Sequence, residues 1–261
     1  MFTGLSKGRS VRTGVVAACL IGGGEAYRLA GGSQLGRVVS RCSASTNGLP
    51  PNPADLRVSY SKQGLDDACL SNDPHVMFRA WFDEACAAKV VEPNAMCLST
   101  CSGNKPSARY VLLKGYDERG FVWYTNYDSR KSAELAENPN AALTFWWGDL
   151  ERSVRIEGRV VRVSAEESDA YFHSRPRSSQ LGAWSSNQSS QIESRAALEQ
   201  QEVDVIKRFD GMDKIPRPPH WGGFRLEPSR IEFWKGRESR LHDRIAFEKL
   251  GGGWATKRLQ P

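Results

Sequence analysis

The chain has 261 residues, of which 39% are hydrophobic and 25% charged, and its formal net charge is +6. This length allows one full hydrophobic core or two small ones. Residues 1–54 hold six basic residues and one acidic residue, so the rest of the chain carries only about one positive charge. The near-neutral remainder argues against a nucleic-acid-binding protein.

Residues 1–54 have the composition of a targeting segment, rich in Arg, Ser, Gly and Ala. Their one apolar run, Val15–Ile21, is far shorter than the ~20 residues that span a bilayer, so we expect no membrane span. The composition favours an organellar transit peptide, plastid or mitochondrial. A secretory signal and a plain extension on a cytoplasmic protein are the alternatives. Because residues 43–56 resemble a linker, we expect an extension over 1–54 and one folded domain over 55–261.

The expected domain begins with a helix and continues in short strands. Asp73 followed by Pro74 is typical of a helix start, with Asp as the cap and Pro in the first turn. Beyond it, β-branched and aromatic runs separated by Gly, Asn or Pro predict strands at 95–101, 108–116, 120–127, 141–148, 153–163, 222–228, 230–236, 242–249 and 254–259. Closely spaced strands with short turns indicate an antiparallel barrel or sandwich rather than βαβ units.

Three further helices are expected at 129–138, 165–175 and 193–209. The first follows the stretch TNYDSRK, Thr125 to Lys131, where a strand runs into a helix start. Unpaired N–H groups at such a start attract phosphate. Arg130 and Lys131 in the first turn oppose the helix dipole, and an anionic ligand would relieve that conflict. Two merely solvated cations are an equally open interpretation.

Two other stretches concentrate cations. In YFHSRPRSSQ (171–180), Arg175 and Arg177 stand among three serines, which suits either a phosphate site or a basic surface loop. In the strand at 108–116, Arg109 and Lys114 bracket residues 110–113, which we expect to be buried on both faces. A cation at the end of an apolar strand needs a partner, either a ligand phosphate or a buried ion pair.

The stretch SRLHDR, Ser239 to Arg244, places three cationic or titratable side chains two residues apart. In an extended strand Arg240, His242 and Arg244 share one face, which would be either a pocket wall or a solvated edge. Cations beside His242 disfavour its imidazolium form, so a neutral histidine is expected.

No CxxC pair occurs among the six cysteines, and no His and acidic residues stand at ligand spacing, so we expect no metal.

The motifs RYVLLKGY, YTNYDSRK, YFHSRPRSSQLGAW, NQSS, WGGFRLEP, IEFWKGRESRLHDR and RLQP together resemble the pyridoxine (pyridoxamine) 5′-phosphate oxidase family, from about Leu56 to Pro261. The resemblance implies a mainly β fold with flanking helices: an FMN-binding split barrel, that is, an antiparallel barrel of six to eight strands. It also implies a homodimer with its sites at the interface. The implied reaction oxidises pyridoxamine or pyridoxine 5′-phosphate with O2 to pyridoxal 5′-phosphate, giving H2O2.

The resemblance assigns site residues motif by motif. Its cofactor contacts fall on Arg109, Val111, Leu112, Tyr124, Thr125, Arg130, Lys131, Ser153, Gln188, Ser189, Trp234 and Arg244. Its substrate-phosphate contacts fall on Lys114, Tyr171, Arg175 and Ser179. Arg240 and His242 would lie over the substrate ring, where either is a candidate for proton transfer. Arg57 and Tyr60 resemble a segment that closes over the site.

Position 153 departs from the family pattern. The family usually has Gln where this chain has Ser153, and the shorter side chain puts about 1 kcal/mol of flavin affinity in question, the scale of one hydrogen bond.

A split-barrel flavin- or haem-binding protein without this oxidase activity is the alternative function. That protein would keep YTNYDSRK but would not need HSRPRSS or RLHDR, and both motifs are present.

Overall fold

The computed structural model describes residues 53, 56, 59–62, 64–65 and 71–261. The predicted extension over 1–54 therefore lies outside the described residues, apart from position 53, and so does Arg57. From residue 57 onward the chain forms one compact unit. None of its described helices is long and apolar enough to cross a membrane.

Nine antiparallel strands form a single sheet in the described part of the chain. Their order is β2-β1-β5-β6-β7-β4-β3, with β8 beside β7 and β9 beside β8. Their bounds are β1 (Ala95–Ser102), β2 (Lys105–Leu112), β3 (Gly115–Asp117), β4 (Gly120–Asn126), β5 (Asn140–Trp147), β6 (Arg152–Arg162), β7 (Trp221–Lys235), β8 (Asp243–Leu250) and β9 (Gly253–Leu259).

The two ends of this strand order, β2 and β3, are separated in the chain by only Leu113 and Lys114. The Leu113 N–H donates to the Asn94 carbonyl, just before β1, and the Lys114 N–H donates to the Val122 carbonyl in β4, at 2.8 Å each. One interrupted strand therefore bonds to β1 and then to β4, and the sheet closes into a split barrel. The predicted fold class is confirmed. The strand number is nine because the β8–β9 hairpin extends the sheet beyond the ring.

The strand β7 runs through a region where two strands were predicted, at 222–228 and 230–236. Its first part pairs with β4 and its last part with β8, while β6 follows it along both parts. The register shifts between Glu157 and Gly158, opposite Pro228, which has no N–H to donate. A Cβ at Gly158 would lie 2.1 Å from the Glu227 carbonyl oxygen, so only glycine fits. The bulge lets the strand continue past its proline.

Helix α1 (Pro74–Ala87) contributes buried aromatic residues to the barrel core. The Asp73 side chain accepts the His75 N–H at 2.8 Å, which is the predicted cap. Phe78 is fully buried, and its ring lies 4.9 Å from that of Phe121 and 5.3 Å from that of Phe145. Edge-to-face contacts of this kind add to the free energy gained by burying aromatic surface.

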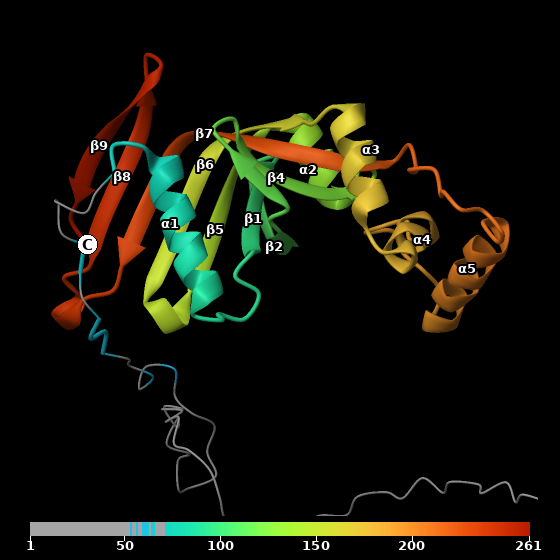
Figure 1. Cartoon of the computed structure of the whole chain (residues 1–261), viewed down its shortest axis with the longest axis horizontal. Helices are drawn as coiled ribbons and strands as arrows, with labels where there is room; N and C mark the ends of the chain where they lie inside the picture. The colour runs from blue at the N-terminus through green and yellow to red at the C-terminus, as the bar shows by residue number, and fades with distance from the viewer. Residues whose placement is uncertain (1–52, 54–55, 57–58, 63, 66–70) are drawn as a thin grey trace, which may run out of the picture. The chain divides into compact units, whose positions relative to one another are not determined.

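The remaining helices are α2 (Arg130–Glu137), α3 (Ala165–Ser174), α4 (Arg177–Ser185) and α5 (Arg195–Arg208), with short 3-10 turns η3 (Gly148–Leu150) and η4 (Glu238–Arg240). In Figure 1, α3 to α5 and the β8–β9 hairpin lie at opposite ends of β7. Phe172, Phe209, Ile215 and Trp221 form a second core under these helices. Helix α4 was not predicted, because the expected helix at 165–175 ends before it and the residues that follow were interpreted as a phosphate site or a basic surface loop. Pro176 instead caps α4, and its carbonyl accepts the Ser179 and Gln180 N–H groups.

Candidate active site

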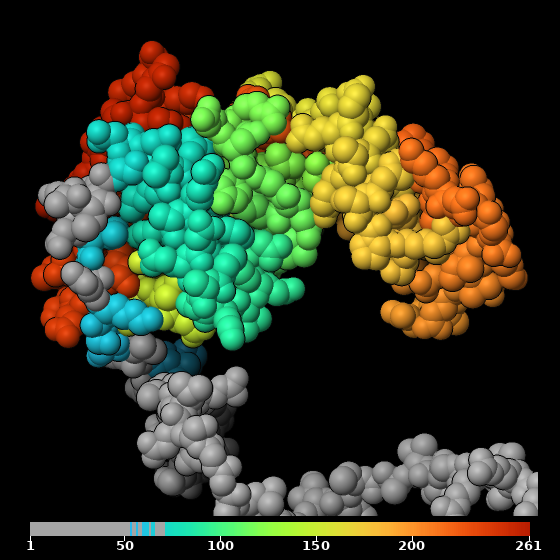
Figure 2. Space-filling view, viewed as in Figure 1, coloured from blue at the N-terminus to red at the C-terminus, as the bar shows by residue number. Residues whose placement is uncertain are grey.

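A cavity of about 590 Å³ lies between the split strand and the helices α3 and α4. Figure 2 shows the surface hollowed between the green strands and the yellow and orange helices. The cavity brings together ten residues that the sequence proposed: Val111, Leu112, Lys114, Tyr124, Thr125, Lys131, Tyr171, Arg175, Ser179 and Gln188. Sequence analysis gave no role to further lining residues, among them Asn126, Ala183, Ser186 and Trp221, although Asn126 stands inside the TNYDSRK stretch. Their signal was weak because none carries a charge and none was matched to a ligand contact by the family resemblance.

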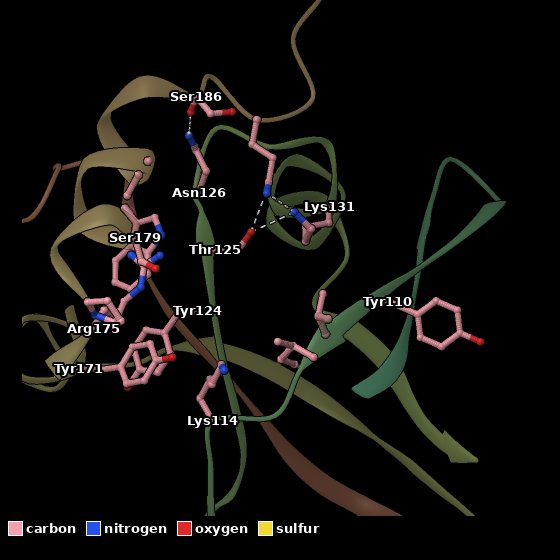
Figure 3. A pocket seen from close by; sticks show the side chains of 17 residues that line it. Tyr110, Lys114, Tyr124, Thr125, Asn126, Lys131, Tyr171, Arg175, Ser179 and Ser186 are labelled. Carbon is pink, nitrogen blue, oxygen red and sulfur yellow. Dashed lines mark hydrogen bonds between the residues drawn. The ribbon is translucent and has the colours of Figure 1, made fainter. Parts of the chain in front are cut away.

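Lys131 forms one end of the cavity and is 8% exposed. Its ammonium donates to Thr125 Oγ1 at 2.9 Å and to Gln188 Oε1 (Figure 3). It also donates to Ser129 Oγ at 3.1 Å. Burial, and then the charge of Arg109, lower the pKa of Lys131 to about 8. A lysine held only by neutral oxygens at a helix start is suited to binding an anion.

Glu134 binds the two arginines behind this end of the cavity. Its carboxylate accepts Arg109 Nη2 at 2.7 Å and Arg130 Nε at 2.8 Å. Burial opposes its ionisation, but the hydrogen bonds from Thr100 and the two arginines hold the pKa of Glu134 below its ordinary value. Arg109 therefore has the ion-pair partner that was one of its two predicted alternatives. Neither arginine is among the residues that line the cavity.

The strand at 110–113 is not buried on both faces as predicted. Tyr110 is 79% exposed and Leu112 38% exposed, while Leu113 is buried. In Figure 3 the ring of Tyr110 points away from the other labelled side chains. The outer face of β2 is uncovered in the single chain, so apolar residues there stay exposed.

Stacked aromatic rings form the other end of the cavity. The rings of Tyr124 and Tyr171 lie 3.9 Å apart, and the ring of Trp221 lies 5.5 Å from that of Tyr124. Burial raises the pKa of Tyr124 to about 12, with Glu167 adding to the effect. Both tyrosines therefore keep their hydroxyl protons at neutral pH and can donate hydrogen bonds from this wall.

Arg175 lies over the Trp221 ring, with its guanidinium carbon 4.7 Å from the ring centroid. Its Nη1 is buried and finds no hydrogen-bond partner among the residues that the structure describes. Burial lowers the pKa of Arg175, and the nearby Tyr171 opposes the shift. A buried, unpaired guanidinium nitrogen is costly, and an anionic ligand would satisfy it.

Arg177, the other arginine of the HSRPRSS stretch, does not line the cavity. Its guanidinium donates to the Met212 carbonyl at 2.7 Å and the Phe209 carbonyl at 2.8 Å. These carbonyls follow α5, so Arg177 satisfies the end of that helix. The two arginines, which sequence spacing could not distinguish, therefore have different partners.

A second cavity of about 510 Å³ lies on the outer face of β5–β8, lined by Thr144, Trp146, Ser153, Arg155, Glu232, Trp234, Arg244 and Pro261. Glu232 accepts Arg244 Nε at 2.8 Å and Arg155 Nη2 at 2.7 Å. Burial opposes its ionisation, but the hydrogen bond from Arg244 and the charge of Arg155 hold the pKa of Glu232 below its ordinary value. The proposed cofactor residues Ser153, Trp234 and Arg244 are thus gathered here, apart from the first ten.

The stretch 239–244 is not a continuous strand, so the predicted row of Arg240, His242 and Arg244 on one strand face is wrong. Strand β8 begins at Asp243, because Ser239 and Arg240 have positive φ values of 55° and 61° and turn the chain through η4. His242 Nδ1 accepts the Arg237 N–H at 3.1 Å. That nitrogen acts as a hydrogen-bond acceptor in this arrangement.

Tyr60 and His242 lie beside the second cavity. The Tyr60 ring centroid is 5.4 Å from that of His242 and 5.5 Å from that of Trp234.

Ser189 follows the cavity residue Gln188 in a left-handed conformation, with φ 72°, and does not line either cavity. Within the described part of the chain, no cluster of three His, Cys, Asp or Glu residues could hold a metal.

A barrel split at one strand, with a cation-lined cavity beside the split, defines a split-barrel protein. Comparisons with known proteins agree: the family model described as pyridoxamine 5′-phosphate oxidase matches residues 82–207, and the model of a pyridoxine 5′-phosphate oxidase C-terminal dimerisation region matches 221–261. The chain belongs to the pyridoxamine 5′-phosphate oxidase family.

Curated relatives support this membership. Proteins named pyridoxine/pyridoxamine 5′-phosphate oxidase from Burkholderia lata and Rubrobacter xylanophilus are each 56% identical, over 80% of this chain and 98% and 96% of their own lengths. A crystal structure of PhzG from Burkholderia lata 383, in complex with tetrahydrophenazine-1-carboxylic acid, is 29% identical with a TM-score of 0.72, covering 78% of this chain and all of that one. The fold is shared by the structure of a pyridoxamine 5′-phosphate oxidase-related, FMN-binding protein from Nostoc punctiforme PCC 73102. That protein is 16% identical with a TM-score of 0.59, and the match covers 74% of this chain and all of that one.

These comparisons overturn the predicted localisation. The relatives just described are bacterial proteins, and no organellar transit peptide is supported for this chain. The prediction was wrong because an Arg- and Ser-rich, acid-poor composition is typical of transit peptides without being specific to them.

Proposed function

We propose that this protein oxidises pyridoxamine 5′-phosphate and pyridoxine 5′-phosphate with O2 to pyridoxal 5′-phosphate, using FMN. Pyridoxine phosphate and O2 give the aldehyde and H2O2, while the amine also consumes water and releases ammonia. The observation that carries the proposal is one cavity with Lys131 at one end and Arg175, beside the stacked aromatic rings, at the other. This arrangement suits two flat ligands that each bear a phosphate. Family membership and the names of the 56% identical relatives add support.

The donor set around Lys131 fits the phosphate of FMN. Its ammonium, the Thr125 hydroxyl and the helix start of α2 are donors of the kind that bind phosphate oxygens. FMN, when bound, accepts the hydride from the substrate and passes the electrons to O2. The chain's own residues would hold it through the twelve positions assigned above: Arg109, Val111, Leu112, Tyr124, Thr125, Arg130, Lys131, Ser153, Gln188, Ser189, Trp234 and Arg244.

The substrate would be held at the Arg175 end. Arg175, Lys114, Tyr171 and Ser179 offer two positive charges and two hydroxyls to its phosphate. Arg240 and His242 would lie over the substrate ring, with His242 presenting Nε2–H because Nδ1 already accepts a hydrogen bond. Arg57 and Tyr60 would close the site. Holding the substrate carbon against the flavin is the protein's main contribution, since the redox chemistry belongs to the cofactor.

A homodimer would complete each site. The proposed cofactor residues divide between two cavities of the single chain, so a site formed from one cavity of each subunit would unite them. The large exposed apolar residues Tyr110 and Leu112 lie on the outer face of β2, where a second copy can cover them. The match to a C-terminal dimerisation region supports this assembly.

Reconstitution with flavins tests the cofactor proposal. The apoprotein should turn yellow with FMN and keep the colour through desalting, because the phosphate adds charge-assisted hydrogen bonds to the ring contacts. Riboflavin, which lacks the phosphate, should be lost in the same desalting step. Absorption near the flavin bands after desalting measures both. A protein that stays colourless with FMN would remove the proposal.

A further inference from the structure

Four side chains form a row across the outer face of β5 to β8. The strand registers pair Trp146 with Ser153, Ser153 with Trp234, and Trp234 with Arg244. All four line the second cavity. The resemblance in sequence assigned three of them to the cofactor but gave no role to Trp146.

The two indoles of this row lean toward each other. Trp146 and Trp234 stand on β5 and β7, which are separated by β6, so their backbones lie roughly 9.6 Å apart at the usual strand spacing. Their ring centroids are only 5.8 Å apart, with an interplanar angle of 45°. The small Ser153 between them leaves this space free, and its hydroxyl donates to the Phe145 carbonyl at 2.9 Å. A longer side chain at 153 would stand between the rings.

Trp146 differs from the core tryptophans in its exposure. Trp81, Trp123 and Trp147 are at most 4% exposed, whereas Trp146 is 55% exposed and lines a cavity. A solvated indole beside guanidinium groups offers a flat apolar surface together with hydrogen-bond donors. This combination suits a flat, conjugated ring system with carbonyl oxygens at its edge.

We infer that Trp146 is a further cofactor-binding residue, whose indole contacts the ring system of FMN next to Trp234, and that the small Ser153 makes this contact possible. The inference rests on the proposed function. It also accounts for Ser153, where the family usually has Gln. The contact with the flavin that a longer side chain would make at this position is made instead by the Trp146 indole. The occupant of the row is a flavin ring rather than the surface of a second copy of the chain.

The test compares FMN and riboflavin binding by titration of the dimeric apoprotein. Trp146→Ala should weaken both ligands equally, by roughly 2- to 12-fold, because an aromatic contact is worth about 0.5–1.5 kcal/mol and does not involve the phosphate. Trp146→Phe should retain most of the affinity. Loss of FMN affinity alone, or no loss for either ligand, would overturn the inference.

A double-mutant cycle tests the link between the two positions. Ser153→Gln in the wild-type background should weaken both flavins by separating the indoles. In the Trp146→Ala background, the same change should have little effect or restore affinity, since the space is then free. Additive effects would overturn the role given to Ser153.

Two measurements separate this inference from its alternatives. In sedimentation experiments without flavin, the Trp146→Ala variant should remain a dimer. Dissociation into monomers would mean that a second copy of the chain covers the indole, and it would overturn the inference. Wild-type protein that binds neither flavin would remove the proposed function as a whole. If the wild type binds both flavins and the Trp146→Ala variant binds them equally well, only the inference about Trp146 is refuted.

Discussion

Arg175→Ala should lower kcat/KM for pyridoxine 5′-phosphate by roughly 10- to 150-fold, mostly through KM, while the Kd for FMN stays unchanged. The range corresponds to the loss of about 1.5–3 kcal/mol for a hydrogen bond to a charged group. The buried, unpaired Nη1 of Arg175 supplies that bond to the substrate phosphate in our proposal. Initial rates at varied substrate concentration, with saturating FMN, measure the effect.

Arg177→Ala provides the matched control, because it removes an identical side chain two residues away. Arg177 binds carbonyls that follow α5, so its loss should lower the free energy of unfolding and leave KM nearly unchanged. If Arg175→Ala reduced FMN affinity as strongly as it raised KM, the substrate-phosphate site would be misassigned.

FMN affinity should be nearly constant from about pH 7 to 8 and should then fall by up to tenfold per pH unit. The ammonium of Lys131, whose pKa is lowered to about 8 by burial, loses its proton in this range. The uncharged amine must then take up a proton to bind the phosphate, and linkage gives a slope of about one proton per phosphate. Titrations with FMN between pH 7 and 9.5 measure this slope, and riboflavin should show no such dependence.

The stability of the apoprotein should change in the opposite direction. In the unfolded chain Lys131 has its ordinary pKa of 10.5, so above pH 8 the unfolded state binds more protons than the folded state. Stability from this group therefore rises between about pH 8 and 10.5. Lys131→Met should abolish both dependences and weaken FMN but not riboflavin, whereas Lys207→Met, on the exposed surface of α5, should change neither. A pH-independent FMN affinity in the wild type would contradict the role of Lys131.

Local patterns predicted the elements well where neighbours in sequence are also neighbours in space. The strand-to-helix step at Thr125–Lys131 forms as expected, because the hydroxyl of Thr125 and the ammonium of Lys131 meet within a few residues. The cap at Asp73 is equally local. The split barrel itself followed from short strands, short turns and the family resemblance.

Features that depend on distant partners could not be predicted. Arg175 and Arg177 stand on either side of Pro176, and only their distant partners, Trp221 for Arg175 and the Met212 carbonyl for Arg177, separate their roles. Arg240 does not lie in the expected strand, because Ser239 and Arg240 both adopt positive φ. Neither residue type predicts that conformation. The approach of the two indoles over Ser153 needs the register of three strands, and that register is set by the whole sheet.

Oxygen uptake by the FMN-loaded protein is the most direct test of the proposed function. The account predicts O2 consumption and H2O2 formation with pyridoxine 5′-phosphate and pyridoxamine 5′-phosphate, in amounts that match the pyridoxal 5′-phosphate formed. Unphosphorylated pyridoxine should react hardly at all, because it offers nothing to Arg175. No O2 uptake with either phosphorylated substrate, from protein that retains FMN, would contradict the account and favour a split-barrel flavin-binding protein with another activity.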